Sequence, residues 1–158
     1  MAKPKVVVAS GRFDLIHKAH IRYLERAKAA GGPGAKLVVV VARDRLVKRE
    51  TGADPTFDEK SRLYMIRTLK PVDRAVLGPS TYDLKSGIRR IILKLKPDII
   101  AIGYDQKWIY SQAKEVMEEM KWHKTKLVRI RRFDYGYLSH SSTIKNLIAS
   151  NVKGKRRT

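Results

Sequence analysis

The chain has 158 residues, no cysteine, and 35 lysines and arginines against 15 acidic residues, which gives a formal net charge of +20. Its length suits one domain with a core of its own, and the lack of cysteine excludes disulfides and thiolate metal sites. The longest apolar runs, residues 6–9 and 37–42, are far shorter than the roughly 20 residues that cross a bilayer. We therefore expect a cytoplasmic protein without a signal peptide or a membrane partner.

Strand and helix patterns alternate along the chain. Apolar runs predict strands at residues 5–9, 37–42, 74–77, 98–102 and 127–130. Helical spacing of apolar residues predicts helices at 19–30, 58–69, 83–95, 106–122 and 141–150. This order predicts a single α/β domain over residues 1–150, with a doubly wound, Rossmann-like, five-stranded parallel sheet and helices on both faces.

Two segments lack such a pattern. Residues 43–56 have no apolar period and contain a glycine and a proline, so we expect a long loop or a short broken helix. Half of residues 151–158 are lysine or arginine, and this basic segment is expected to form a disordered tail.

Ligands of doubly wound sheets bind beyond the carboxyl ends of the strands, beside the first strand. Four polar loops leave those ends, at residues 10–20, 43–56, 104–107 and 131–143. We expect the functional site where these loops meet.

His17 and His20 lie three residues apart at the start of the first predicted helix, so both side chains can point the same way. The N-terminus of a helix attracts anions through its free N–H groups and its dipole. Two imidazoles that donate hydrogen bonds at this place would hold phosphate oxygens.

Other interpretations of the two histidines are weaker. Zinc needs three or four ligands, and the chain offers only His123 and His140 besides, both distant in sequence. We therefore predict no protein-bound metal. The Walker A and G-x-G-x-x-G patterns are both absent. Surface histidines without a role would not explain a glycine turn directly after a buried strand.

Residues 11–20, Gly-Arg-Phe-Asp-Leu-Ile-His-Lys-Ala-His, resemble the G-T-F-D-x-x-H-x-G-H signature of the nucleotidyltransferase superfamily of cytidylyltransferases and adenylyltransferases. Residues 41–44, Lys48 and the Ser-Ser-Thr-Ile at 141–144 are similar to later motifs of that family, in the same order. Residues 69–73 and 96–106 are similar to its archaeal FAD synthase branch. The chain departs from the signature at Arg12, Lys18 and Ala19, and the methyl group of Ala19 stands where glycine lets a nucleotide approach closely.

The resemblance implies transfer of AMP from ATP to FMN, giving FAD and pyrophosphate, with Mg²⁺ or another divalent cation bound mainly by phosphates and water. A phosphate monoester is mostly dianionic at neutral pH, so the reaction needs no general base. The resemblance also implies a homodimer. It assigns catalysis to His17, His20 and Lys48, nucleotide binding to Gly11, Arg12, Phe13, Asp105, Arg132, Ser142 and Thr143, and the acceptor phosphate to Lys48 and Arg62.

Two alternatives remain open. A cytidylyltransferase acting on glycerol phosphate or a similar alcohol phosphate would use the same loops. A nucleic-acid-binding protein on the same fold would explain the net charge of +20, although a solvated basic surface explains it equally well. Tyr104, Trp108 and Tyr110 could stack on adenine or a flavin ring, or could pack in the core.

Overall fold

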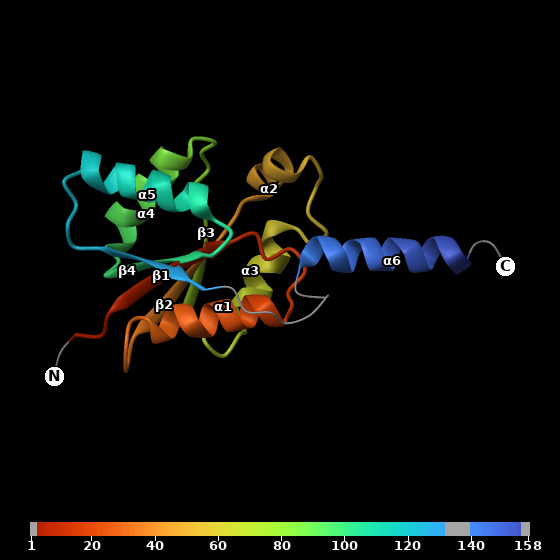
Figure 1. Ribbon diagram of the computed structural model, residues 1–158, viewed down its shortest axis with the longest axis horizontal. Helices are drawn as coiled ribbons and strands as arrows, with labels where there is room; N and C mark the ends of the chain where they lie inside the picture. Colours follow the sequence, from red (N-terminus) through yellow and green to blue (C-terminus); the bar gives the residue numbers. More distant parts are fainter. Residues whose placement is uncertain (1–2, 132–139, 156–158) are drawn as a thin grey trace.

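The computed structural model describes residues 3–131 and 140–155, and its centre is a parallel sheet of five strands in the order β3-β2-β1-β4-β5. Neighbouring strands pair in parallel throughout, as the sequence predicts (Figure 1). The chain steps outward from β1 to β3 and then returns to place β4 beside β1, so the loops after β1 and β4 diverge. The strands are β1 (Val6–Gly11), β2 (Lys36–Val41), β3 (Arg74–Leu77), β4 (Ile99–Gly103) and β5 (Lys126–Ile130).

Helices cover both faces of the sheet. Leu24 of α1 and Ile66 of α3 are fully buried against the face that carries Val7 and Val39. The opposite face packs against α4 and α5, and Figure 1 shows these two helices and α1 on opposite sides of the strands. The helices are α1 (Lys18–Ala29), α2 (Asp44–Thr51), α3 (Glu59–Arg67), α4 (Leu84–Leu95), α5 (Lys107–Glu119) and α6 (Ser141–Lys155).

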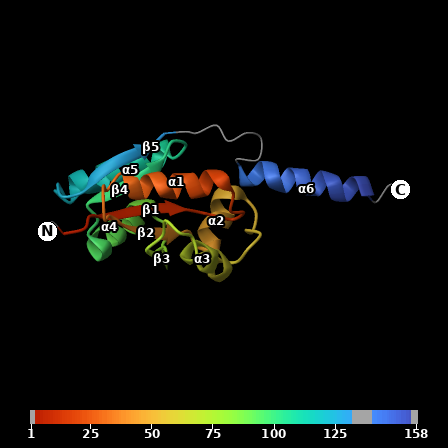
Figure 2. The same cartoon turned by 90° about the horizontal axis from the view of Figure 1, so that it is seen from below.

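In two segments the secondary structure differs from the one predicted from the sequence. The segment after β2 contains a regular helix, α2, which ends at Gly52 because that residue adopts a left-handed conformation, with φ of 76°. The expected disordered tail from residue 151 is wrong as far as Lys155, since α6 continues to that residue. Figures 1 and 2 show α6 running away from the sheet. Within residues 3–131 and 140–155, no helix is both long and apolar enough to cross a membrane.

Replacing Leu24 with alanine tests the packing of α1 on the sheet. The side chain is 0% exposed, so Leu24→Ala should lower the free energy of unfolding by about 2 to 5 kcal/mol through the lost transfer energy and the cavity left behind. Leu93→Ala, at a position 53% exposed on α4, is the matched control and should cost far less. Urea denaturation of both variants measures the difference, and equal losses would contradict the assigned core.

Candidate active site

A cavity of about 450 Å³ opens beyond the carboxyl ends of β1 and β4. Its walls come from the loop after β1, the end of α2, the loop between β4 and α5, the end of β5 and the first turn of α6. These are the four loops whose meeting the sequence predicts, and they meet at the point where the strand order reverses.

The turn after β1 is shaped by Gly11 and Phe13. Phe13 is buried in a left-handed conformation, with φ of 50°, and its ring folds back under Gly11. A Cβ atom on Gly11 would lie 2.7 Å from Cζ of Phe13, so only glycine leaves room for the ring. The same ring meets His20 edge to face, with 5.3 Å between the centroids. The Phe13 ring therefore packs against His20 and helps to fix its position.

His17 and His20 form a stacked pair in the cavity wall, with ring centroids 3.8 Å apart and planes at 23°. His17 is the N-cap residue of α1, and its carbonyl accepts from the N–H groups of His20 and Ile21. The Nδ1 atoms of both histidines are buried without a hydrogen-bond partner among the described residues. Such unpaired polar atoms beside a helix N-terminus are suited to a polar ligand.

Both imidazoles are neutral at physiological pH. Burial, together with the nearby His17 and Arg12, lowers the pKa of His20 to about 3. Burial and His140 also lower the pKa of His17. A neutral imidazole carries one N–H donor and one acceptor nitrogen. The pair can therefore donate hydrogen bonds to an anion without carrying charge of its own.

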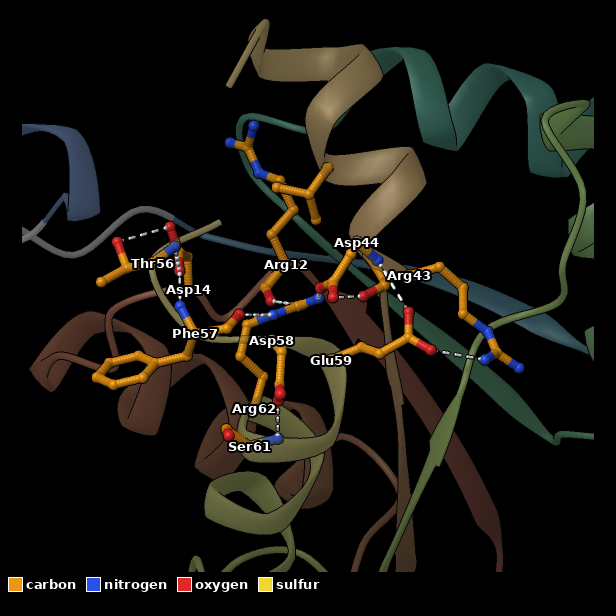
Figure 3. A network of polar contacts seen from close by, with 12 residues as sticks. Arg12, Asp14, Arg43, Asp44, Thr56, Phe57, Asp58, Glu59, Ser61 and Arg62 are labelled. Atoms are coloured by element: carbon orange, nitrogen blue, oxygen red, sulfur yellow. Dashed lines mark hydrogen bonds and ion pairs between the residues drawn. The ribbon is translucent and has the colours of Figure 1, made fainter. Parts of the chain in front are cut away.

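The side chain of Arg62 on α3 is 0% exposed. Figure 3 shows its guanidinium among Arg12, Asp44 and Phe57. Its Nη2 atom bonds Asp44 Oδ1 at 2.6 Å, which holds the first turn of α2 against α3. The expected contact between Arg62 and an acceptor phosphate is wrong, because the guanidinium is buried and engaged by the protein itself. It also donates to three main-chain carbonyls, those of Arg12, Ala42 and Phe57.

Glu59 strengthens the same junction. Its carboxylate accepts from the N–H of Asp44 at 3.0 Å and from Nη1 of Arg43 at 2.8 Å (Figure 3). Burial alone would raise the pKa of Glu59, but these hydrogen bonds outweigh it and hold the pKa below its usual range. The start of α2 is therefore fixed from two sides.

Asp14 joins three separate parts of the site. It is 7% exposed and accepts from the N–H groups of Thr56 at 2.7 Å and Phe57 at 3.2 Å (Figure 3). It also pairs with Lys145 of α6. Burial would raise the pKa of Asp14, but the bonds from Lys145, Phe57 and Thr56 lower it overall. Together with the bond from Ser141 Oγ to the Leu15 carbonyl at 3.0 Å, this contact seats the first turn of α6 at the cavity.

The structure brings most of the predicted site residues together. Those that line the cavity are Gly11, Arg12, Phe13, His17, His20, Asp105 and Ser142. Thr143 lies in the first turn of α6 but does not line it. Arg132 lies outside the described residues. Within the described ranges, no group of three or more His, Asp or Glu side chains could hold a metal ion.

Lys48 and two of the three aromatic candidates do not line the cavity. Lys48 is on α2, 61% exposed and paired with Asp54 at 3.0 Å, and it does not line the cavity. Tyr104 does line it. Tyr110 packs in the core between α4 and α5, and Trp108 is half-exposed. Core packing is therefore the better interpretation for Tyr110.

The residues that line the cavity without having been expected from the sequence include Tyr23, Gln106 and Lys145. Tyr23 follows His20 by three residues on α1, and Lys145 follows Ser141 by four on α6. The spacing from His20 is a signal that could have found Tyr23, whereas Ser141 was not itself a predicted site residue and gave no such signal for Lys145. Tyr23 donates to the Ala101 carbonyl at 2.9 Å, and burial raises the pKa of its phenol.

A neutral histidine pair at a helix N-terminus, in a cavity at the reversal point of a doubly wound sheet, defines a nucleotide-binding α/β protein. A cytidylyltransferase-like family model matches residues 8–147. The chain belongs to this cytidylyltransferase-like family.

Curated relatives and solved structures agree with this membership. The FAD synthase of Thermoplasma acidophilum is 42% identical over 142 residues, which cover 90% of this chain and 92% of the relative. The FAD synthase of Methanothermus fervidus is 43% identical over 128 residues, covering 80% and 82%. A crystal structure described as a lipopolysaccharide core biosynthesis protein from Thermoplasma volcanium is 42% identical with a TM-score of 0.69, covering 82% and 98%. Pantothenate synthetase from Thermus thermophilus, 16% identical with a TM-score of 0.57 over 89% and 64%, shares the fold.

Removing the guanidinium of Arg62 should destabilise the protein strongly. Arg62→Ala leaves Asp44 and three main-chain carbonyls without their donor, and we expect a loss of about 3 kcal/mol in the free energy of unfolding. Arg67→Ala, on an exposed position of the same helix, should cost much less. Denaturant titration of both variants measures this, and an Arg62→Ala protein as stable as the control would refute the structural role.

The lowered pKa of His20 predicts a pH dependence of stability. His20 binds a proton near pH 6.5 in the unfolded chain but only near pH 3 in the folded protein. The free energy of unfolding should therefore fall as the pH drops through this window. Denaturation at about pH 7.5 and about pH 5 should show a smaller difference for His20→Asn than for the wild type. His123→Asn, at an exposed position, should keep the wild-type dependence. An unchanged dependence in His20→Asn would contradict the burial of a neutral imidazole.

Proposed function

We propose that the protein is an FMN adenylyltransferase, which transfers AMP from ATP to FMN and releases FAD and pyrophosphate. The observation that supports it most is the neutral His17–His20 pair at the N-terminus of α1, in the cavity of a chain similar to curated FAD synthases over nine tenths of its length.

The reaction makes little use of general acid–base catalysis. A phosphate oxygen of FMN attacks the α-phosphorus of ATP, a new P–O bond forms, and the bond to the bridging oxygen of pyrophosphate breaks. The attacking monoester is a dianion at neutral pH and needs no base to activate it. The protein therefore contributes position and charge stabilisation, and neither histidine acts as a base or as a nucleophile.

His17 and His20 donate hydrogen bonds to the α-phosphate and to the leaving pyrophosphate. The backbone N–H groups around Gly11, Arg12 and Phe13 and the positive end of the α1 dipole act on the same oxygens. The first turn of α1 contains no acidic side chain that would compete with the phosphates for this place. These donors are fixed before the reaction begins, because the turn and the ring stack are already packed.

Binding roles for Ser142, Thr143 and Arg132 at the β- and γ-phosphates stay predictions, and so does the acceptor-phosphate role of Lys48. Among the residues that the structure describes, the Lys48 side chain pairs only with Asp54, and the two side chains are 61% and 72% exposed. Exposed pairs contribute less than about 1 kcal/mol, so an incoming phosphate dianion can replace the carboxylate.

Mg²⁺ or a similar divalent cation enters with ATP as part of the substrate. Asp14, the most buried cavity carboxylate, is already paired with Lys145. The side chains present therefore fit an ion held mainly by phosphate oxygens and water. The positive charge of this ion would neutralise part of the negative charge of the triphosphate.

A homodimer and a cytoplasmic location also stay predictions. The outer part of α6 exposes Leu147, Ile148 and Val152, which lie at helical spacing and offer an apolar surface that a second copy could cover. Sedimentation equilibrium distinguishes a dimer from a monomer.

Incubation with ATP, FMN and Mg²⁺, followed by chromatography, should yield FAD and pyrophosphate in equal amounts. His17→Ala and His20→Ala should each lower kcat by about 100-fold or more while the protein stays folded, because each removes a preorganised donor. His123→Ala is the matched control and should retain wild-type turnover.

Two outcomes would contradict this function. One is turnover of CTP with glycerol phosphate and no FAD, which identifies a cytidylyltransferase. The other is salt-sensitive binding of nucleic acid that neither histidine variant affects, together with no transfer activity.

A further inference from the structure

The loop between β4 and α5 fixes the orientation of a glutamine side chain at the cavity. The N–H of Gly103 donates to Oε1 of Gln106 at 3.0 Å. A backbone N–H can only donate, so the amide atom that faces it is the oxygen, and the NH₂ group occupies the other branch. Gln106 lines the cavity, and its Nε2 atom has no hydrogen bond to another of the described residues.

Asp105 lies beside this amide. A Cβ atom on Gly103 would be 3.0 Å from Oδ1 of Asp105 and 3.3 Å from Oε1 of Gln106, so the two side chains flank the glycine. The loop is also tied to β5, because Arg129 donates to the Tyr104 carbonyl at 3.0 Å. The cavity wall therefore presents a carboxylate acceptor and an amide donor next to each other.

Charge determines which part of a nucleotide fits here. The carboxylate of Asp105 repels phosphates, which the histidine pair and the N-terminus of α1 attract instead. An uncharged ring with a donor beside an acceptor is the complementary ligand. The amino edge of adenine has this pattern, with the 6-amino group next to the ring nitrogen N1.

We propose that Asp105 and Gln106 select the triphosphate by the amino edge of its base. Nε2 of Gln106 donates to the ring nitrogen, and Asp105 accepts from the amino group. A 6-keto purine reverses both partners, and the amide cannot turn to suit it without losing its bond to Gly103. The pair separates amino bases from keto bases, and cytosine shares the adenine pattern. This inference depends on the proposed function only in placing a nucleotide in this cavity.

ATP and inosine triphosphate differ only at this edge, so their relative binding is the test. We expect ATP to bind roughly 10- to 100-fold more tightly to the wild type, measured by calorimetry without FMN. In Gln106→Glu, one oxygen keeps the bond to Gly103 and the other becomes an acceptor. The preference for ATP should then fall at least about tenfold, and adding Asp105→Asn should favour inosine triphosphate. Gln112→Glu makes the same charge change on α5 away from the cavity and should keep the wild-type preference.

Equal binding of ATP and inosine triphosphate by the wild type would overturn the proposal. So would a Gln106→Glu protein that keeps the preference of the Gln112→Glu control. A rise in KM for FMN with an unchanged ratio of the two triphosphates would place the flavin ring here instead, and would also overturn it. Because binding is measured without FMN, a failure to make FAD is a separate result.

Discussion

The guanidinium of Arg62 is buried at the carboxyl edge of the sheet and connects four segments that are far apart in sequence. It bonds the main chain after β1, the end of β2, the loop before α3 and the first turn of α2. Burying a charge costs several kcal/mol unless it is paired and its donors are satisfied. The burial of Arg62 and the positions of these segments are therefore mutually dependent, and the cavity walls on this side are fixed by the folded core.

This rigidity explains the chemistry of the histidines. Because the Phe13 ring fills the space under Gly11 and meets His20 edge to face, His20 is partly withdrawn from solvent, and its pKa falls to about 3. A neutral pair has no counter-ion to release before it meets a phosphate. In the proposed function the pair supplies donors that are already oriented, and preorganised donors of this kind are usually the largest single contribution to electrostatic catalysis.

The sequence was sufficient to predict the sheet and the position of the two histidines. It was insufficient to predict the contacts of the basic residues Arg62 and Lys48. Continuous apolar runs identify buried parallel strands, and the spacing of His17 and His20 correctly places both side chains together at the start of a helix beside the cavity. Arg62 was misplaced because three of its four partners are main-chain carbonyls, which no pattern of side chains reveals. The resemblance alone assigns Lys48 to the acceptor phosphate, and this role stays a prediction, because Lys48 does not line the cavity. On α2, Val47 is buried and Lys48 faces solvent.

The contacts of α6 could not be predicted for a different reason. Lys145 pairs with Asp14 across 131 positions of the chain, and among 35 basic residues nothing local distinguishes it. Gln106 was missed because its role depends on the direction of one amide, which only the backbone of Gly103 determines.

The central claim is that the neutral histidine pair positions ATP for direct attack by the acceptor phosphate, without a covalent enzyme intermediate. The stereochemistry at phosphorus tests it most directly. With ATP that carries a chiral α-thiophosphate, ³¹P NMR of the thio-FAD product should show inversion, the result of a single in-line displacement. Retention would require two displacements at the α-phosphorus through an adenylylated histidine, and would contradict the account.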